Sequence, residues 1–258
     1  MLFDTALSGL QARVAILESV VEILSGLLAP PKLFVSEVVR GFRYENPDVR
    51  HFCLLKAVRA VSALNAAIEL APKGYTQELA VLMRIVTECT KRIEYVLDMD
   101  DTEEHRSNVK TYLREFFEDI RREPEAEIKG VLIREERVNE QLGKTLDGIS
   151  KRYGDTGERV PAAQLFYRSS RAFSFYVHAR YPEAMDLYGG SPGRWHLRGM
   201  GQTPKDSENL EILDTFITTA STTFVIMVQG IPQLLELVSR EPTLRQWYAE
   251  SVGRIGPG

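Results

Sequence analysis

The chain has 258 residues, of which 44% are hydrophobic and 26% are charged, and its net charge is −4. This composition is typical of a globular protein with a sizeable core, and it excludes a disordered chain, a collagen and a disulfide scaffold. The negative overall charge argues against tight nonspecific binding to duplex DNA, which requires a broadly basic surface.

Helical periodicity dominates the start of the chain. Apolar residues recur every three or four positions over residues 3–28, which predicts a helix that Pro30 and Pro31 terminate. We expect a second, shorter helical segment at residues 33–39. The sequence shows no strand alternation and no internal repeat.

Two further helices are predicted up to residue 97. Asn46, Pro47 and Asp48 supply a cap residue, a proline for the first helical position and an acid for the first turn, so a helix begins there and runs to about Leu70. Thr76 is expected to cap the next helix, whose buried stripe extends to Leu97.

The middle of the chain is predicted to hold three helices and a long loop. Apolar residues from Val109 to Ile120 mark the first helix, and a charged, peripheral helix covers residues 125–152. The third helix runs from Pro161 to Pro182, and residues 189–206 form an irregular loop. Long structureless connections of this kind are often functional.

The last fifty residues are again helical. Asp206 or Ser207 is expected to cap a helix through Val228, which Gly230 and Pro232 should kink before residues 233–252 continue as helix. The charge-free stretch over residues 215–235 is long enough to cross a membrane. Its hydroxyl and amide side chains favour a buried central helix instead.

These elements predict an all-α bundle of about seven to nine helices with one long irregular loop. We expect a single all-helical domain over residues 1–258. Its core is suggested to lie in residues 46–204, with peripheral helices in residues 1–45 and 205–258. The order of residues at the start of the chain is not that of a signal peptide, so a cytoplasmic protein is expected.

Metal ions and cofactors are not expected. Cys53 and Cys89 lie within apolar periodic stretches and fit buried, reduced thiols, and no CxxC pattern is present. No histidine has a glutamate three residues before it, as a di-iron bundle requires, and neither HExxH nor a P-loop occurs.

Charge is unevenly distributed along the chain. Residues 159–205 hold seven Lys or Arg against two acids, and eight of the 23 aromatic residues. Within this window, Arg171 and His178 lie seven residues apart, about 20° short of two helical turns, so both leave one face of the predicted helix. Tyr167 and Ser174 lie on the same face.

This stripe combines groups that suit phosphate chemistry. A guanidinium can hold a phosphate through two hydrogen bonds, and an imidazole beside it can exchange a proton with a ribose hydroxyl. The alternative is a partly buried, hydrogen-bonded His178 and an Arg171 that pairs with an acid from another helix. Binding of a small ligand is a third possibility.

Two other groups of residues are candidates for the same site. Arg84 and Glu88 lie four apart on an otherwise apolar helix, where they can form a structural ion pair or orient His178 or Arg171. The loop combines cations with an aromatic face, which suits a nucleotide base or an anion, unless it is a solvated loop anchored by Trp195. The expected substrate-binding residues are Arg168, Arg194, Trp195, His196 and Arg198.

The segment Arg171-Ala-Phe-Ser-Phe-Tyr-Val-His178 resembles the Arg-x(4–6)-His motif of HEPN-type helical domains, many of which are metal-independent ribonucleases of toxin–antitoxin and phage-defence systems. The wider pattern, Arg84-x-x-x-Glu88 with a later Y…S-x-x-V/Y-H segment, resembles a bacterial helical family of unknown function. Ala172 departs from the polar residue that usually follows the motif arginine, and two more helical segments follow the motif here.

The resemblance implies phosphate contact by Arg171, general acid–base catalysis by His178 and a homodimer that brings two such helices together. The first hypothesis is therefore a HEPN-like ribonuclease, or a relative that only binds RNA. The second is a non-enzymatic helical interaction or regulatory module with a protein partner. A membrane location is not expected under either hypothesis.

Overall fold

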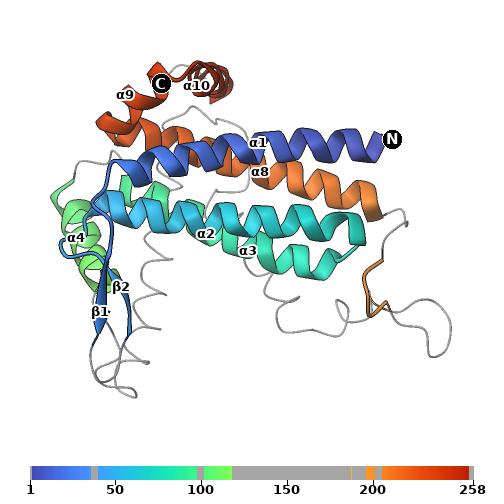
Figure 1. The fold of residues 1–258 in the computed structure, drawn as a ribbon, viewed down its shortest axis with the longest axis horizontal. Coiled ribbons are helices and arrows are strands. Elements are labelled where there is room, and N and C mark those ends of the chain that lie inside the picture. The colour runs from blue at the N-terminus through green and yellow to red at the C-terminus, as the bar shows by residue number, and fades with distance from the viewer. Residues whose placement is uncertain are drawn as a thin grey trace.

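The computed structural model describes residues 2–35, 40–97, 102–117, 187, 196–200 and 205–255. Within them the chain forms seven α-helices, a short 3₁₀ helix and one two-stranded sheet, so the predicted all-α class is confirmed. Four long helices lie side by side (Figure 1): α1 (Leu2–Gly26), α2 (Val49–Leu70), α3 (Thr76–Leu97) and α8 (Lys205–Gly230). The shorter helices are α4 (Glu103–Phe117), α9 (Pro232–Arg240) and α10 (Pro242–Ile255).

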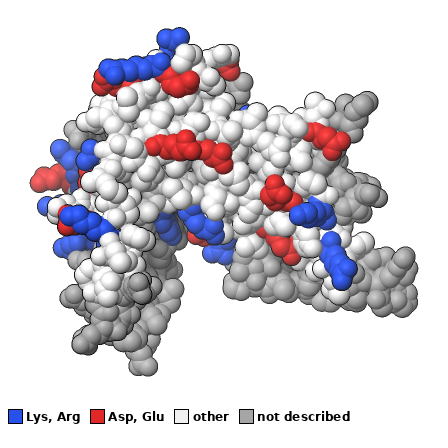
Figure 2. Space-filling model, viewed as in Figure 1, with Lys and Arg blue, Asp and Glu red and all other residues white. Residues whose placement is uncertain are grey.

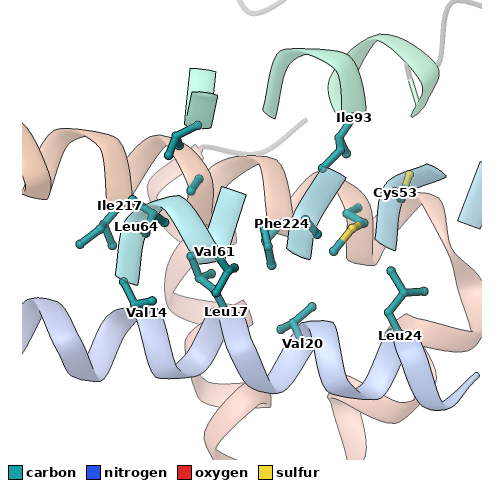
Figure 3. Close-up of a cluster of buried hydrophobic side chains, with 14 of the residues drawn as sticks. Val14, Leu17, Val20, Leu24, Cys53, Val61, Leu64, Ile93, Ile217 and Phe224 are labelled. Carbon is teal, nitrogen blue, oxygen red and sulfur yellow. The ribbon is translucent and has the colours of Figure 1, made fainter. Parts of the chain in front are cut away.

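The core is one apolar cluster to which all four long helices contribute. Leu17, Val20 and Leu24 of α1 are fully buried, because apolar residues recur every three or four positions on one helical face. Figure 3 shows this face of α1 packed against side chains of α2 and α8, among them Val61 and Phe224. Burial of each such side chain contributes about 1.5–3 kcal/mol. Helices on both sides of residues 46–204 thus belong to the core rather than to its periphery.

Helix α8 occupies a central position in the bundle. Leu213, Ile217 and Phe224 are fully buried, as the polar yet charge-free sequence of this region led us to expect. The helix contacts α1, α2, α3, α9 and α10. By length and composition alone, its segment Glu208–Gly230 is also apolar enough to cross a membrane, and 44% of its most apolar window is buried within the protein.

The residue that caps the start of α2 is not the expected one. Asp48, rather than Asn46, is the N-cap, and its Oδ1 accepts hydrogen bonds from the backbone N–H groups of Arg50 at 3.0 Å and His51 at 3.3 Å. Pro47 therefore precedes the cap instead of occupying the first helical position. The prediction is wrong because both Asn46 and Asp48 are good caps, and only Asp48 is also held by the Arg50 and His51 side chains.

The turn between α2 and α3 begins with the 3₁₀ helix η1 (Ala71–Lys73), after which Gly74 adopts a left-handed conformation with φ of 72°. Thr76 is the first residue of α3, and its buried hydroxyl has no hydrogen-bond partner, so the expectation that it caps the helix is wrong. The backbone carbonyl of Tyr75 accepts from Leu79 N–H at 3.0 Å instead.

The C-terminal helices are separated by breaks, not by a kink. Helix α8 ends at Gly230, Ile231 is extended with φ −124° and ψ 95°, and Pro232 begins α9. A second break at Glu241 precedes Pro242, so the expected continuous helix over residues 233–252 is wrong. Both prolines occupy a first helical position, where a missing N–H group costs nothing.

A strand occupies residues 33–35, where a helix over residues 33–39 was expected, and residues 36–39 lie outside the described part of the chain. Strand β1 (Lys32–Val35) pairs antiparallel with β2 (Arg40–Arg43), with Leu33 opposite Phe42. The run Leu33-Phe34-Val35 favours a strand because aromatic and β-branched side chains fit a pleated surface, and Pro30-Pro31 has already ended α1. The hairpin projects from the end of the bundle (Figure 1), and Figure 2 shows mainly uncharged residues over it with Lys or Arg side chains near its base.

Candidate functional site

Arg84 and Glu88 form the predicted ion pair on α3. Arg84 Nε donates to Glu88 Oε1 at 2.9 Å, and the two side chains are 33% and 36% exposed. The pair lies on the side of α3 that faces away from the buried stripe of Leu79, Met83 and Val86. Both groups are therefore accessible to a ligand or to another side chain while they hold each other.

The Cys89 thiol lies near three cations, Lys56, Arg59 and Arg92, and near the Glu88 carboxylate. Burial raises the pKa of the Cys89 thiol, against the opposing effect of the nearby cations Lys56 and Arg92. Burial together with the negative charge of Asp48 raises the pKa of Cys53 to about 12. Both cysteines are free, buried thiols, as predicted. Since they stay protonated near neutral pH, they pack as apolar side chains and are unsuited to nucleophilic catalysis.

A buried polar network links α3 to α8. Glu94 Oε2 contacts Lys91 Nζ at 2.6 Å, and Glu94 Oε1 accepts from Thr223 Oγ1 at 2.6 Å. The Glu94 side chain is 8% exposed and Thr223 is fully buried. Both carboxylate oxygens are thereby satisfied, which is the condition under which a buried charge is tolerated. The network fixes the position of α3, and with it the Arg84–Glu88 pair.

The residues of the predicted phosphate stripe lie outside the described part of the chain. They are Tyr167, Arg171, Ser174 and His178. The same holds for Arg168, Arg194 and Trp195, and for the predicted helices over 125–152 and 161–182. Their convergence with Arg84 and Glu88 remains a prediction.

Only two loop candidates, His196 and Arg198, are described. His196 is half-buried, with its N–H donating to Leu187 O at 2.8 Å, and Arg198 is exposed. Gly199 and Met200 lie against the turn between α2 and α3, where the backbone N–H of Met200 donates to Gly74 O at 2.9 Å. This anchor lies beside the start of α3, whereas Arg84 comes eight residues into the helix, about 12 Å further along. The structure therefore separates this part of the loop from the Arg84–Glu88 pair.

The sequence analysis missed an Asp–His pair at the start of α2. His51 Nδ1 lies 2.8 Å from Asp48 Oδ1, and the edge of the Tyr44 ring packs against the imidazole at 4.4 Å between centroids. Burial on its own would raise the pKa of Asp48, but hydrogen bonds from Arg50 and His51 outweigh it and lower that pKa to about 2. The same Nδ1 atom lies 3.1 Å from the backbone nitrogen of Asp48, whose N–H donates to it in the capping box.

His51 of this pair lines a cleft of about 340 Å³ between the end of α1, the base of the hairpin and the start of α2. The geometry of the Asp48–His51 pair is fully accounted for by a capping box, in which each side chain accepts a hydrogen bond from the backbone N–H of the other residue. The Asp-x-x-His spacing immediately before an apolar run was the sequence signal for it. We therefore assign Asp48 and His51 a structural role.

Among the described residues, no group of three or more His, Cys, Asp or Glu side chains is arranged to hold a metal ion. Comparison of the chain with protein-family models, with curated proteins and with solved structures gives no match. Functional assignment thus depends on the chain's own residues.

Proposed function

We propose that this protein is a HEPN-like, metal-independent ribonuclease, or an RNA-binding relative, that acts as a homodimer in a cytoplasmic bacterial defence or toxin–antitoxin system. The observation that carries the proposal is the spacing of Arg171 and His178, which puts a guanidinium and an imidazole on one face of a predicted helix. The basic, aromatic-rich composition of residues 159–205 supports it, because such surfaces bind single-stranded nucleic acid.

The proposed reaction uses the RNA's own 2′-hydroxyl as the nucleophile. His178 removes the 2′-OH proton while the 2′-oxygen attacks the neighbouring phosphorus, and Arg171 stabilises the charge that develops on the phosphoryl oxygens. The bond to the 5′-oxygen breaks, and that oxygen takes up a proton. The products are a 2′,3′-cyclic phosphate and a 5′-hydroxyl end, and no metal is required.

The Arg84–Glu88 pair has a supporting role in this proposal. Glu88 is more than one-third exposed on α3 and carries a second carboxylate oxygen besides the one that Arg84 binds. That oxygen is available to orient the imidazole of His178 or the guanidinium of Arg171. The cations beside Cys89, Lys56 and Arg92, would add to the attraction for a phosphate backbone.

The test is cleavage of varied RNAs by the purified protein in EDTA. Wild type is expected to cleave, or at least to bind, while His178→Ala abolishes cleavage and Arg171→Ala weakens binding. Arg180→Ala is the matched control, because nine residues, about 900°, place Arg180 on the opposite face of the same predicted helix from Arg171. Neither binding nor cleavage across varied RNAs, or full cleavage by His178→Ala, would contradict the proposal.

The second candidate function is a non-enzymatic interaction module, and the hairpin favours it. Leu33, Val35 and Phe42 share one face of the sheet and are 53%, 64% and 67% exposed. A two-stranded hairpin is marginally stable without packing, so an apolar face of this kind suits coverage by another protein. Phe42→Ser should then reduce association measured by analytical ultracentrifugation, while His178→Ala leaves it intact. Equal association of Phe42→Ser and wild type would argue against this candidate.

A further inference from the structure

A cleft of about 430 Å³ lies between α1, α8 and α10, on the opposite side of α8 from the Glu94–Thr223 contact with α3. Each helix lines it with one face. Helix α8 contributes Thr218, Ser221 and Thr222, and α10 contributes residues spaced by three and four positions from Thr243 to Ser251. Its volume falls within the range of roughly 300–1,000 Å³ that small-molecule sites occupy.

The cleft exists because short side chains face α10. Helix α10 is anchored by Leu244 and Trp247, which are 2% and 9% exposed. The facing residues of α8 are serine and threonine, whose small side chains do not fill the space between the two helices. The break at Glu241 sets α10 apart from α9, so the gap is a feature of the backbone path and not of one rotamer.

The lining offers hydroxyl groups that the described part of the chain leaves available. Thr222 Oγ1 donates to Thr218 O at 3.2 Å, but no hydrogen bond within the described residues holds the hydroxyls of Ser221, Thr243 and Ser251. A hydroxyl both donates and accepts, so this set matches a ligand that itself carries hydroxyl groups.

The charged groups of the cleft already make polar contacts with neighbouring side chains. Arg13 contacts the Asp214 carboxylate and donates to Thr218 Oγ1 at 2.7 Å. Glu250 Oε1 accepts from Gln246 Nε2 at 2.9 Å. An anion would have to displace Asp214 from Arg13 and would lie in a cleft that also holds the Glu250 carboxylate, which disfavours anionic ligands.

We propose that this cleft binds an uncharged, hydroxyl-bearing small molecule with one flat apolar face, such as a nucleoside or a pyranose. The hydroxyls of Ser221 and Ser251 exchange hydrogen bonds with the ligand. Ile16 and the indole of Trp247 supply the apolar contact, as aromatic residues do in such sites. The proposal is independent of the ribonuclease function, since it uses none of the same residues.

Fluorescence of Trp247 tests the proposal directly. The chain has two tryptophans, so Trp195→Phe leaves Trp247 as the only indole reporter. The probes are adenosine and methyl glucoside, which distinguish a nucleoside from a pyranose, with inorganic phosphate as the charged comparison. A saturable change with one neutral probe, and none with phosphate, is the expected result.

Variants that fill the cleft locate the binding. In the Trp195→Phe background, Ser221→Leu and Ser251→Leu should each weaken binding at least tenfold. Ser239→Leu is the matched control, because Ser239 is exposed on α9 and bonds only its own helix backbone at Leu235 O. Circular dichroism shows which variants fold. Two filling variants are used so that the test still stands if one of them misfolds. No saturable change with either neutral probe, binding of phosphate at least as tight, or unchanged binding by both folded filling variants would overturn the proposal.

Discussion

Replacing Thr223 with valine tests the link between α3 and α8. The two side chains have nearly the same shape, so the substitution removes the hydroxyl and little else. Thr223 Oγ1 donates to Glu94 Oε1 at 2.6 Å, and both residues are buried, so Thr223→Val leaves one oxygen of a buried carboxylate without its partner. The contact joins residues 129 positions apart and is therefore a tertiary constraint.

The expected loss of stability follows from the charge of the acceptor. Hydrogen bonds to charged groups contribute about 1.5–3 kcal/mol, compared with about 1 kcal/mol between neutral groups. For a chain of this size each kcal/mol corresponds to roughly 2–4 °C in Tm, so we expect Thr223→Val to lower Tm by about 3–12 °C. Lys91 continues to hold the other oxygen, Glu94 Oε2, which keeps the loss within this range.

The assay is thermal or urea unfolding followed by circular dichroism, with Thr215→Val as the matched control. Thr215 lies on the same helix but is exposed, and its hydroxyl donates only to Glu211 O at 2.9 Å. The control should change stability by less than about 0.5 kcal/mol. A double-mutant cycle with Glu94→Gln isolates the pairwise coupling. Equal melting of the Thr223→Val and Thr215→Val proteins would refute the reasoning.

Three further substitutions probe other parts of the fold. Asp48→Ala should cost about 1 kcal/mol at pH 7 through loss of the α2 cap. Because folding lowers the pKa of Asp48 from 3.8 to about 2, its stabilisation is complete above about pH 4 and is lost as the pH falls towards 2. The wild-type advantage in urea unfolding should therefore shrink over that range. Gly199→Ala should destabilise by more than about 1 kcal/mol, because Gly199 has φ of 83° and a Cβ would lie 2.0 Å from Lys73 O. Phe224→Ala should cost about 3–5 kcal/mol, since the ring is fully buried in the core.

Each of these predictions has an outcome that contradicts it. The cap assignment fails if the stability difference between wild type and Asp48→Ala is the same at pH 7 and pH 3. For the glycine, Gly9→Ala is the control, because it lies in α1 with open space around the added methyl group. Gly9→Ala should leave stability unchanged or raise it, because alanine favours a helix more than glycine does. The same result for Gly199→Ala would show that Gly199 is not constrained. A loss below about 1 kcal/mol for Phe224→Ala would mean that the core around α8 is not close-packed.

Local sequence patterns predicted most of the helices, and they failed where two local solutions were equally good. The spacing of Leu17, Val20 and Leu24 predicted helix α1, and Pro30 predicted where it ends, because both signals act within a few residues. The run Leu33-Phe34-Val35 is too short to show a period, so strand and helix remained indistinguishable until β2 supplied its pairing partner. At Pro232, a kink and a new helix differ only in the backbone of Ile231, which is extended.

The same distinction applies to the candidate site. The Arg84–Glu88 pair was predictable because both residues belong to one helix and are four positions apart. The contact of Glu94 with Thr223, by contrast, depends on how α3 and α8 pack, which no local pattern reveals. The cleft lined by Ser221 and Trp247 was missed for the same reason, since it exists only between helices from opposite ends of the chain.

The most direct test of the proposed ribonuclease activity is the chemistry of the RNA ends. Mass spectrometry of RNA incubated with the protein in EDTA should show 2′,3′-cyclic phosphate and 5′-hydroxyl products, which are absent with His178→Ala. Intact RNA, or 5′-phosphate ends that persist in that variant, would contradict a mechanism in which His178 activates the 2′-hydroxyl.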